Sequence, residues 1–155
     1  MKSLSTVIYT SRSSEEFHEH EIPDLLKQIR RANAKQELTG MLLYIGGSFL
    51  QALEGQLLMV ETVFSAILRD KRHTHVRLIT KEPILERAFE GWTMMQQTLD
   101  PIEADECIGE TDYFASADWI IQLDVNRAKK LLSAASVRWQ MEHRTGKYRT
   151  LGGFT

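Results

Sequence analysis

The sequence predicts an α+β fold, a ferredoxin-like sandwich in which two helices cover one face of a five-stranded mixed sheet. Segments with strand and helix periodicity follow one another in the order β-α-β-β-α-β-β. Two of these strands adjoin at a glycine pair, which is typical of a β-hairpin. Each helix connects two strands, so both are expected to stack on the same side of the sheet, and further helices are expected C-terminal to it.

The first strand is predicted over residues 4–10, which are rich in β-branched side chains and place Tyr9 on one face. Ser13 and Glu16 have the spacing of a capping box, but Pro23 is better suited to the first turn of the helix that follows. The apolar stripe of this helix ends in an amide: Ile22, Leu25, Leu26, Ile29 and Asn33. Asn33 is either a C-cap or a functional amide.

The hairpin is predicted over residues 38–55, with Gly46 and Gly47 in its turn. In its second strand, the period of two puts Gln51 on the same face as the large apolar residues Phe49 and Leu53. A buried amide without hydrogen-bond partners destabilises a fold by roughly 1–3 kcal/mol. Gln51 is therefore either an amide satisfied by the nearby backbone or a functional group.

A second amphipathic helix is predicted over residues 57–70, because Val60 and the apolar residues after it keep helical spacing. The basic residues 71–75 are expected to form a turn. A strand follows over residues 76–80, and we expect it to end before Pro83, which cannot donate a hydrogen bond to a sheet.

The last strand of the sheet is predicted over residues 89–95, with Trp92 and Met94 on a common face. Beyond it the composition changes, and the acidic residues 100–106 are expected to form a connector. We therefore divide the chain into a unit at residues 1–98 and a C-terminal extension at residues 99–155.

The extension is expected to contain a helix from residue 125 to about residue 143, for which Asp124 is a good N-cap. Trp119 and Trp139 are large apolar side chains, so this region is expected to pack on the domain or on another subunit. Residues 145–155 include three glycines and are expected to be frayed.

Composition excludes several classes of protein. The 155 residues are 43% hydrophobic and 26% charged, which is ordinary for a globular domain. The net charge of −2 gives no electrostatic reason to expect binding to nucleic acid or to an anionic membrane. The one cysteine, Cys107, excludes an internal disulfide, and there is no signal-peptide pattern or membrane-length apolar run. We expect a cytoplasmic protein.

Motifs for catalysis or metal binding are weak. The histidine pairs at residues 18 and 20 and at residues 73 and 75 have no cysteine or acidic partner that completes a metal site, so no metal is expected. Cys107 lies in an acidic segment, which disfavours its thiolate. No glycine-rich phosphate loop and no nucleophile elbow is present.

Three polar residues on otherwise apolar faces remain: Tyr9, Asn33 and Gln51. In a ferredoxin-like sandwich the first and third strands can be neighbours, which would bring Tyr9 and Gln51 within hydrogen-bond distance. A helix over that face would add Asn33. Two amides and a phenol in an apolar slot suit a planar heterocycle with C=O and N–H groups.

A family resemblance is carried by blocks in register over residues 3–98. They are IYTS at 8–11, RAN at 31–33, LTGMLLY at 38–44, FLQALEG at 49–55, RDKRH at 69–73, EPI at 82–84 and FEGWTM at 89–94. Together these blocks closely resemble the BLUF family, the blue-light sensors that use FAD. The resemblance implies that residues 1–98 form a photosensor domain that holds FAD non-covalently between two helices, with FMN or riboflavin as alternatives.

The resemblance also implies roles for individual residues. Gln51 corresponds to the switch glutamine, and Tyr9 to the tyrosine that donates an electron to the excited flavin. A glutamine amide carries both a donor and an acceptor, so its rotation or tautomerisation exchanges which of them faces the flavin. Asn33 corresponds to the residue that binds the ring edge.

Four further residues are expected at the same site. Arg72 and His73 are expected to line the ring or its phosphate side. Trp92 and Met94 resemble the last-strand pair whose relation to the flavin differs between dark and lit states. The chain departs from the family at Ala32, where many members carry a second polar residue, and this removes one flavin contact.

No output domain is recognisable beyond residue 98, so the resemblance implies a sensor without enzymatic turnover. It is expected to change its contacts with a downstream signalling protein through the last strand and the C-terminal helices, and to form a homo-oligomer. Two alternatives stay open at this point. One is a flavin reductase or acylphosphatase-like hydrolase on the same fold, and the other is a family member without flavin that acts as an adaptor.

Overall fold

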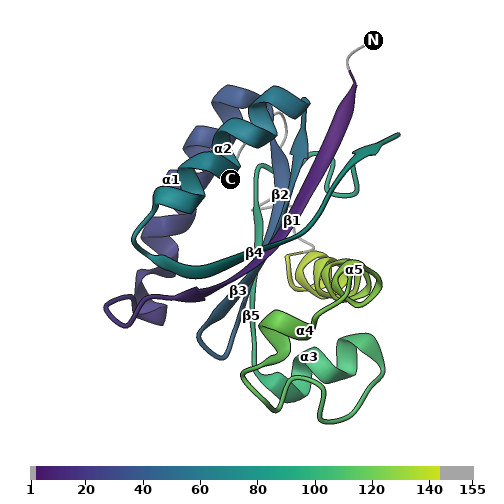
Figure 1. The fold of residues 1–155 in the computed structure, drawn as a ribbon. Coiled ribbons are helices and arrows are strands. Elements are labelled where there is room, and N and C mark those ends of the chain that lie inside the picture. The colour runs from purple at the N-terminus through teal and green to yellow at the C-terminus, as the bar shows by residue number, and fades with distance from the viewer. Residues whose placement is uncertain (1–2, 144–155) are drawn as a thin grey trace.

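A five-stranded sheet with the order β4-β1-β3-β2-β5 forms the centre of the computed structural model, which describes residues 3–143 (Figure 1). The strands are β1 (Leu4–Ser13), β2 (Thr39–Ile45), β3 (Ser48–Gly55), β4 (His73–Ile84) and β5 (Met95–Leu99). The helices are α1 (Ile22–Gln36), α2 (Leu57–Arg69), α3 (Pro101–Ile108), α4 (Trp119–Gln122) and α5 (Val125–Glu142), and a short 3-10 helix, η1 (Glu19–Glu21), precedes α1.

The sheet is mixed, as predicted. β1 is antiparallel to both β3 and β4, β2 and β3 form the predicted hairpin, and β5 is parallel to β2. The hairpin turn uses Gly46 and Gly47, which have φ angles of 55° and 85° that glycine adopts without strain. β1 and β3 are therefore neighbours, and Tyr9 pairs with Gln51 in their register.

Helices cover both faces of the sheet. α1 and α2 lie on one face, and α3, α4 and α5 lie on the other (Figure 1). Each side has its own apolar core, and alternate residues of the central strands contribute to one or the other. Val7, Tyr9 and Leu53 belong to the core beneath α1 and α2. Ile8 and Ala52 belong to the core shared with the C-terminal helices. No helix within residues 3–143 is both long and apolar enough to span a bilayer.

The prediction that β4 ends before Pro83 is wrong. β4 runs from His73 to Ile84 and includes this proline, because β4 lies at the edge of the sheet. An edge strand pairs on one side only, so a proline can direct its missing N–H away from the ladder. The expected basic turn is correspondingly shorter, since the last three of its five residues belong to the strand.

The last strand also lies later in the chain than predicted. β5 spans Met95–Leu99, whereas Phe89 to Met94 form an irregular segment held by side chains from other elements. Glu54 accepts hydrogen bonds from the backbone N–H groups of Ala88 and Phe89, at 2.6 and 3.0 Å. Such contacts between distant residues leave no period in the local sequence.

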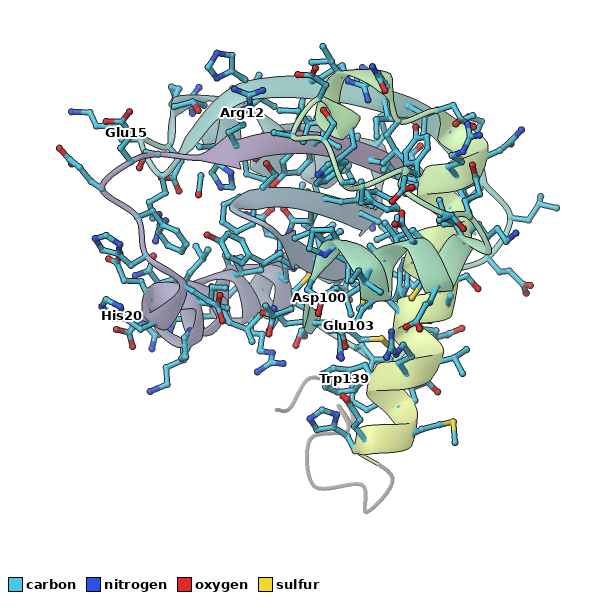
Figure 2. The ribbon with its side chains drawn as sticks, turned by 90° about the horizontal axis from the view of Figure 1, so that it is seen from below. Arg12, Glu15, His20, Asp100, Glu103 and Trp139 are labelled. Atoms are coloured by element: carbon cyan, nitrogen blue, oxygen red, sulfur yellow. The ribbon has the colours of Figure 1, made fainter. Side chains whose placement is uncertain are left out.

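The acidic residues 100–106 form a helix rather than a connector. α3 begins at Pro101, with Asp100 as its N-cap, and the carboxylates of Asp100 and Glu103 accept each other's backbone N–H at 2.8 and 2.9 Å (Figure 2). This is a complete capping box followed by a proline at the first helical position. The predicted N-cap of the last helix is confirmed, because Asp124 accepts a hydrogen bond from the N–H of Arg127. The prediction of a frayed tail at residues 145–155 lies outside the described residues.

Candidate flavin site

Tyr9 and Gln51 are joined by a hydrogen bond in the core beneath α1 and α2. They face each other across β1 and β3, and the phenol O–H of Tyr9 donates to Oε1 of Gln51. Tyr9 is 0% exposed and Gln51 is 2% exposed. The structure thus places the two residues together as the alternation of the strands predicts.

The amide nitrogen of Gln51 has a weaker partner. Its Nε2 lies 3.7 Å from Sδ of Met94, and a thioether sulfur is a weak acceptor. The carbonyl end of this amide is therefore well satisfied by Tyr9, whereas the N–H end retains capacity to donate to a stronger acceptor.

Asn33 lies on the buried face of α1 with half of its amide satisfied. Its Nδ2 donates to the carbonyl oxygen of Thr93 at 2.8 Å. Within residues 3–143, the only buried side-chain oxygen or nitrogen atoms without a hydrogen-bond partner are Oδ1 of Asn33 and Oε1 of Gln36. Asn33 is not the C-cap of α1, because Glu37 takes that position in a left-handed conformation.

A cavity of about 250 Å³ opens between α1 and α2 above β3. It exposes the apolar faces of both helices together with an unusual number of amides. Its lining includes Leu25, Gln28, Ile29, Ala32, Asn33, Gln36, Gln51, Leu53, Val63, Ile67, Asp70, Arg72 and His73. Four of the seven predicted site residues thus line one cavity: Asn33, Gln51, Arg72 and His73. Tyr9 reaches it through its hydrogen bond to Gln51.

Arg72 lines this cavity and is held by Asp70 of the same turn and by Gln28 of α1. It forms an ion pair with Asp70 at 2.6 Å, and its Nη1 donates to Oε1 of Gln28 on α1 at 3.1 Å. Burial opposes ionisation of Asp70, but the hydrogen bonds and charge of Arg72 outweigh it and lower the pKa of this carboxyl. Asp70 is therefore a carboxylate at neutral pH.

His73 packs in the wall of the cavity. Its ring lies 4.9 Å from the ring of Phe49, and its Nδ1 is 2.8 Å from Oγ of Ser11. Burial lowers the pKa of His73, and the neighbouring charge of Arg72 acts in the same direction, while Asp70 opposes them. The imidazole is therefore neutral at neutral pH.

Burial raises the pKa of Tyr9 strongly, and the negative charge of Asp70 adds to this effect. The phenol therefore keeps its proton throughout the accessible pH range. Its proton lies in the hydrogen bond to Gln51, so it has one defined acceptor.

Trp92 and Met94 do not share a face, which corrects the prediction made for them. Met94 is 1% exposed and lies in the core with Tyr9, in contact with Gln51. Trp92 packs against the other core, where its ring meets that of Trp139 at 4.6 Å and 84°. The irregular backbone of this segment breaks the alternation on which the prediction rests.

Four residues at or beside the cavity were missed from the sequence: Gln28, Gln36, Asp70 and Arg30. Polar residues are usual on the outer face of an amphipathic helix, and Gln28 and Arg30 gave no reason to expect otherwise. Gln36 follows Asn33 by three positions, which places both on one face of α1. That spacing was the one available indication.

Comparison with known proteins identifies the family to which the chain belongs. A sequence profile described as "BLUF: Sensors of blue-light using FAD" matches residues 4–95, which is more than half of the chain. The chain belongs to the BLUF family. It is thus a blue-light sensor of the class that uses FAD, and the predicted resemblance is confirmed.

The relatives of this BLUF chain include proteins that are much longer than the matched region. Photoactivated adenylate cyclase subunit beta of Euglena gracilis is 32% identical over 97 residues, which are 62% of this chain and 11% of that protein. The blue light- and temperature-regulated antirepressor BluF of Escherichia coli (strain K12) is 33% identical over 73 residues, 47% of this chain and 18% of that protein. The chain therefore spans about a tenth to a fifth of the length of these relatives.

A solved structure extends the likeness beyond the matched region. The dark-state structure of BlrB, a BLUF protein, superposes with a TM-score of 0.66 at 26% identity, covering 88% of this chain and 98% of that one. The α+β fold with helices after the sheet is therefore confirmed.

The residues around the cavity fit the ring system of a flavin. A flavin ring presents one N–H and two C=O groups along one edge, and the unpartnered Oδ1 of Asn33 is an acceptor that such an N–H satisfies. Nε2 of Gln51 offers a donor. At about 250 Å³ the cavity lies just below the range of roughly 300–1,000 Å³ that is usual for ligand sites, so it suits the ring rather than the whole dinucleotide.

Proposed function

We propose that Tyr9 and Gln51 form the light-driven switch of this BLUF chain. The observation that carries the proposal is their buried hydrogen bond at the wall of a cavity with an unsatisfied amide acceptor. When bound, FAD absorbs blue light and supplies an excited ring that accepts an electron. All other steps belong to side chains of the chain.

Tyr9 is the proposed electron and proton donor. A phenol is oxidisable, and loss of an electron makes its O–H strongly acidic. The proton of Tyr9 already lies in a hydrogen bond to Oε1 of Gln51, so it moves along that bond when the electron leaves. In the dark the raised pKa holds the proton on the phenol, which keeps the switch at rest.

Gln51 is the proposed switching element. Protonation at Oε1 followed by rotation or tautomerisation exchanges the donor and acceptor ends of its amide. Rotation of the amide costs little at its nitrogen end, because the contact of Nε2 with Sδ of Met94 is weak and readily lost. The electron and a proton then return to Tyr9, so the net result is a rearranged Gln51 amide that would present a different hydrogen bond to the ring, without a covalent change in the cofactor.

The remaining site residues are proposed to hold the cofactor. Asn33 would bind the ring edge through its free Oδ1, and Gln36 offers a second free acceptor one turn further along α1. Arg72 and His73 would line the ring or its phosphate side. Because the cavity suits the ring, FMN or riboflavin would also enter it.

We propose that residues 1–98 sense light, and that residues 99–155 transmit the change without enzymatic turnover of their own. The ring contact of Trp92 with Trp139 supports this proposal, because it joins the segment before β5 to α5. Trp139 lies toward the C-terminal end of α5 (Figure 2). The named relatives include a cyclase subunit and an antirepressor. We propose that this chain likewise acts on a signalling protein, which would be a separate one, and that it does so in the cytoplasm as a homo-oligomer.

Absorption spectroscopy of Gln51→Leu tests the switch. The purified wild-type protein should be yellow, and blue light should shift its flavin bands to longer wavelength, reversibly in the dark. Gln51→Leu should retain flavin and lose this shift, because leucine has no donor or acceptor to exchange. Gln96→Leu on β5 serves as the matched control and should keep it. A full red shift in Gln51→Leu would exclude the proposed mechanism.

A further inference from the structure

Arg30 on α1 holds the main chain of the segment that leads into β5. Its Nε and Nη2 both donate to the carbonyl oxygen of Met94, at 3.1 and 3.0 Å. None of the ion pairs found in residues 3–143 involves Arg30. A partly buried guanidinium is thus devoted to one neutral carbonyl, and hydrogen bonds from a charged donor are roughly twice as strong as neutral ones.

Asn33 holds the neighbouring peptide from the same face of the helix. It follows Arg30 by three residues and donates to the carbonyl oxygen of Thr93 at 2.8 Å. Two consecutive carbonyls of one segment are therefore fixed by two side chains of α1. The side chain of Met94 is meanwhile in contact with Gln51, so this residue is held at both ends.

The segment that these bonds hold directs Met94 toward Gln51 and Trp92 toward Trp139. With the carbonyls of Thr93 and Met94 fixed, Met94 enters the core of Tyr9 and Trp92 enters the core of α5. Asn33 also lines the cavity, whereas Arg30 does not, so Arg30 acts on the segment alone.

We propose that Arg30 is a positioning residue that locks the inward placement of Met94 in the dark, and that its two hydrogen bonds yield when Gln51 rearranges. The proposal rests on the proposed function for its light-driven part. Its structural part, the clamp itself, concerns only residues of this chain.

Hydrogen exchange of the full-length, FAD-loaded protein, measured by mass spectrometry in the dark and under blue light, tests the lock. In the wild type, light should raise the hydrogen-exchange rate of residues 92–97 about tenfold, because the hydrogen bonds that hold this segment in place are then broken. Arg30→Met removes both bonds and should raise exchange about tenfold already in the dark, leaving less than about a twofold light effect. Its red shift should persist, because Tyr9 and Gln51 are unchanged.

Two variants and one flavin-free measurement complete the experiment. Arg31→Met removes the same charge from the exposed neighbouring position and should behave as the wild type. Arg30→Lys retains a charged donor and should restore a large part of the light effect. Without flavin, Arg30→Met should still raise exchange in residues 92–97, because the clamp does not involve the cofactor.

The proposed lock would be overturned if the hydrogen-exchange rate of residues 92–97 in the dark were within twofold of the wild-type rate in the Arg30→Met protein. A wild-type protein without any red shift would instead overturn the proposed function, and the flavin-free comparison would still decide the clamp. If methionine unfolds the protein, Arg30→Gln takes its place and is judged by the same ratios.

Discussion

Trp92 and Met94 are separated by one residue, yet their side chains lie in the two different cores of the molecule. The ring of Trp92 contacts Trp139 of α5, and Sδ of Met94 lies 3.7 Å from Nε2 of Gln51. Thr93 between them is buried. A single short stretch of main chain therefore contacts the amide of Gln51 on one side and the C-terminal helix α5 on the other.

Tyr9→Phe should abolish the light-induced red shift while the protein stays folded and yellow. Phenylalanine keeps the ring in its buried position, but it has no O–H to donate to Gln51 and is not oxidised by an excited flavin. A light-minus-dark absorption spectrum measures the effect, with less than about a tenth of the wild-type amplitude expected. Tyr44→Phe is the matched control, because this tyrosine is also buried and its hydroxyl lies 3.5 Å from Ser13, away from Gln51. A normal spectrum for Tyr9→Phe would contradict the role of the phenol.

Asn33→Ala should weaken FAD binding by about tenfold or more, which corresponds to roughly 1.4 kcal/mol. The substitution removes the free acceptor Oδ1 and also the bond from Nδ2 to Thr93. Fluorescence titration of the flavin-free protein gives the dissociation constant. Asn126→Ala, at an exposed position on α5, should bind FAD as the wild type does. Equal affinities in the two variants would remove Asn33 from the binding site.

Gly40→Ala should lower the free energy of unfolding by about 2 kcal/mol or more. A Cβ atom at this position would overlap the backbone carbonyl oxygen of Ala52 and lie 3.0 Å from Cε of Met94. The hairpin strands would have to separate to accommodate it. Chemical denaturation measures the change. Gly47→Ala is a useful comparison, because the added Cβ meets no atom within 4 Å, so the cost comes from the φ of 85° alone and is roughly 1–2 kcal/mol. A Gly40→Ala protein as stable as Gly47→Ala would contradict the close contact.

His73 should make the flavin-free protein less stable as the pH falls below about 6.5. Burial lowers the pKa of His73 in the folded state, so the unfolded chain takes up the proton first. The contribution of His73 to the free energy of unfolding is then fully present above the unfolded pKa and is lost as the pH falls toward the folded pKa. The loss amounts to about 1.4 kcal/mol for each pH unit that separates the two pKa values.

Urea denaturation between pH 5 and 8 measures this dependence. His73→Asn keeps a group that can bond to Ser11 and should reduce the slope. The exposed His20, replaced by Asn, provides the control. An identical slope in the His73→Asn protein would show that another group is responsible.

The parts of the fold that follow local patterns were predicted correctly. The period of two along β1 and β3 was enough to place Tyr9 and Gln51 on one face, and the helical stripe was enough to bury Asn33. Asp124 was correct as an N-cap because capping depends on neighbouring residues. The same rule applied to Asp100 and Pro101 would have found α3, but the acidic composition of that segment was interpreted as a connector.

The errors lie where distant residues determine the backbone. β5 was placed too early because Arg30, Asn33 and Glu54 hold the preceding segment in an irregular path. Pro83 is tolerated within β4 because this strand lies at the edge of the sheet. The order of the strands is not visible in the local sequence, so the proline alone wrongly predicts the end of a strand. In the site, Asp70 and Gln28 gave no sequence indication, since their importance comes from contact with Arg72 across the fold.

The alternation of the two central strands has a consequence for engineering. Tyr9 and Gln51 form one register pair, and the adjacent pair, Ile8 and Ala52, faces the opposite core. The residues of the proposed light switch and those that face the C-terminal helices thus occupy interleaved positions of the same two strands. A designer can graft a different C-terminal helix by recoding only the residues that face it, and an insertion of one residue in either strand would exchange the two sets.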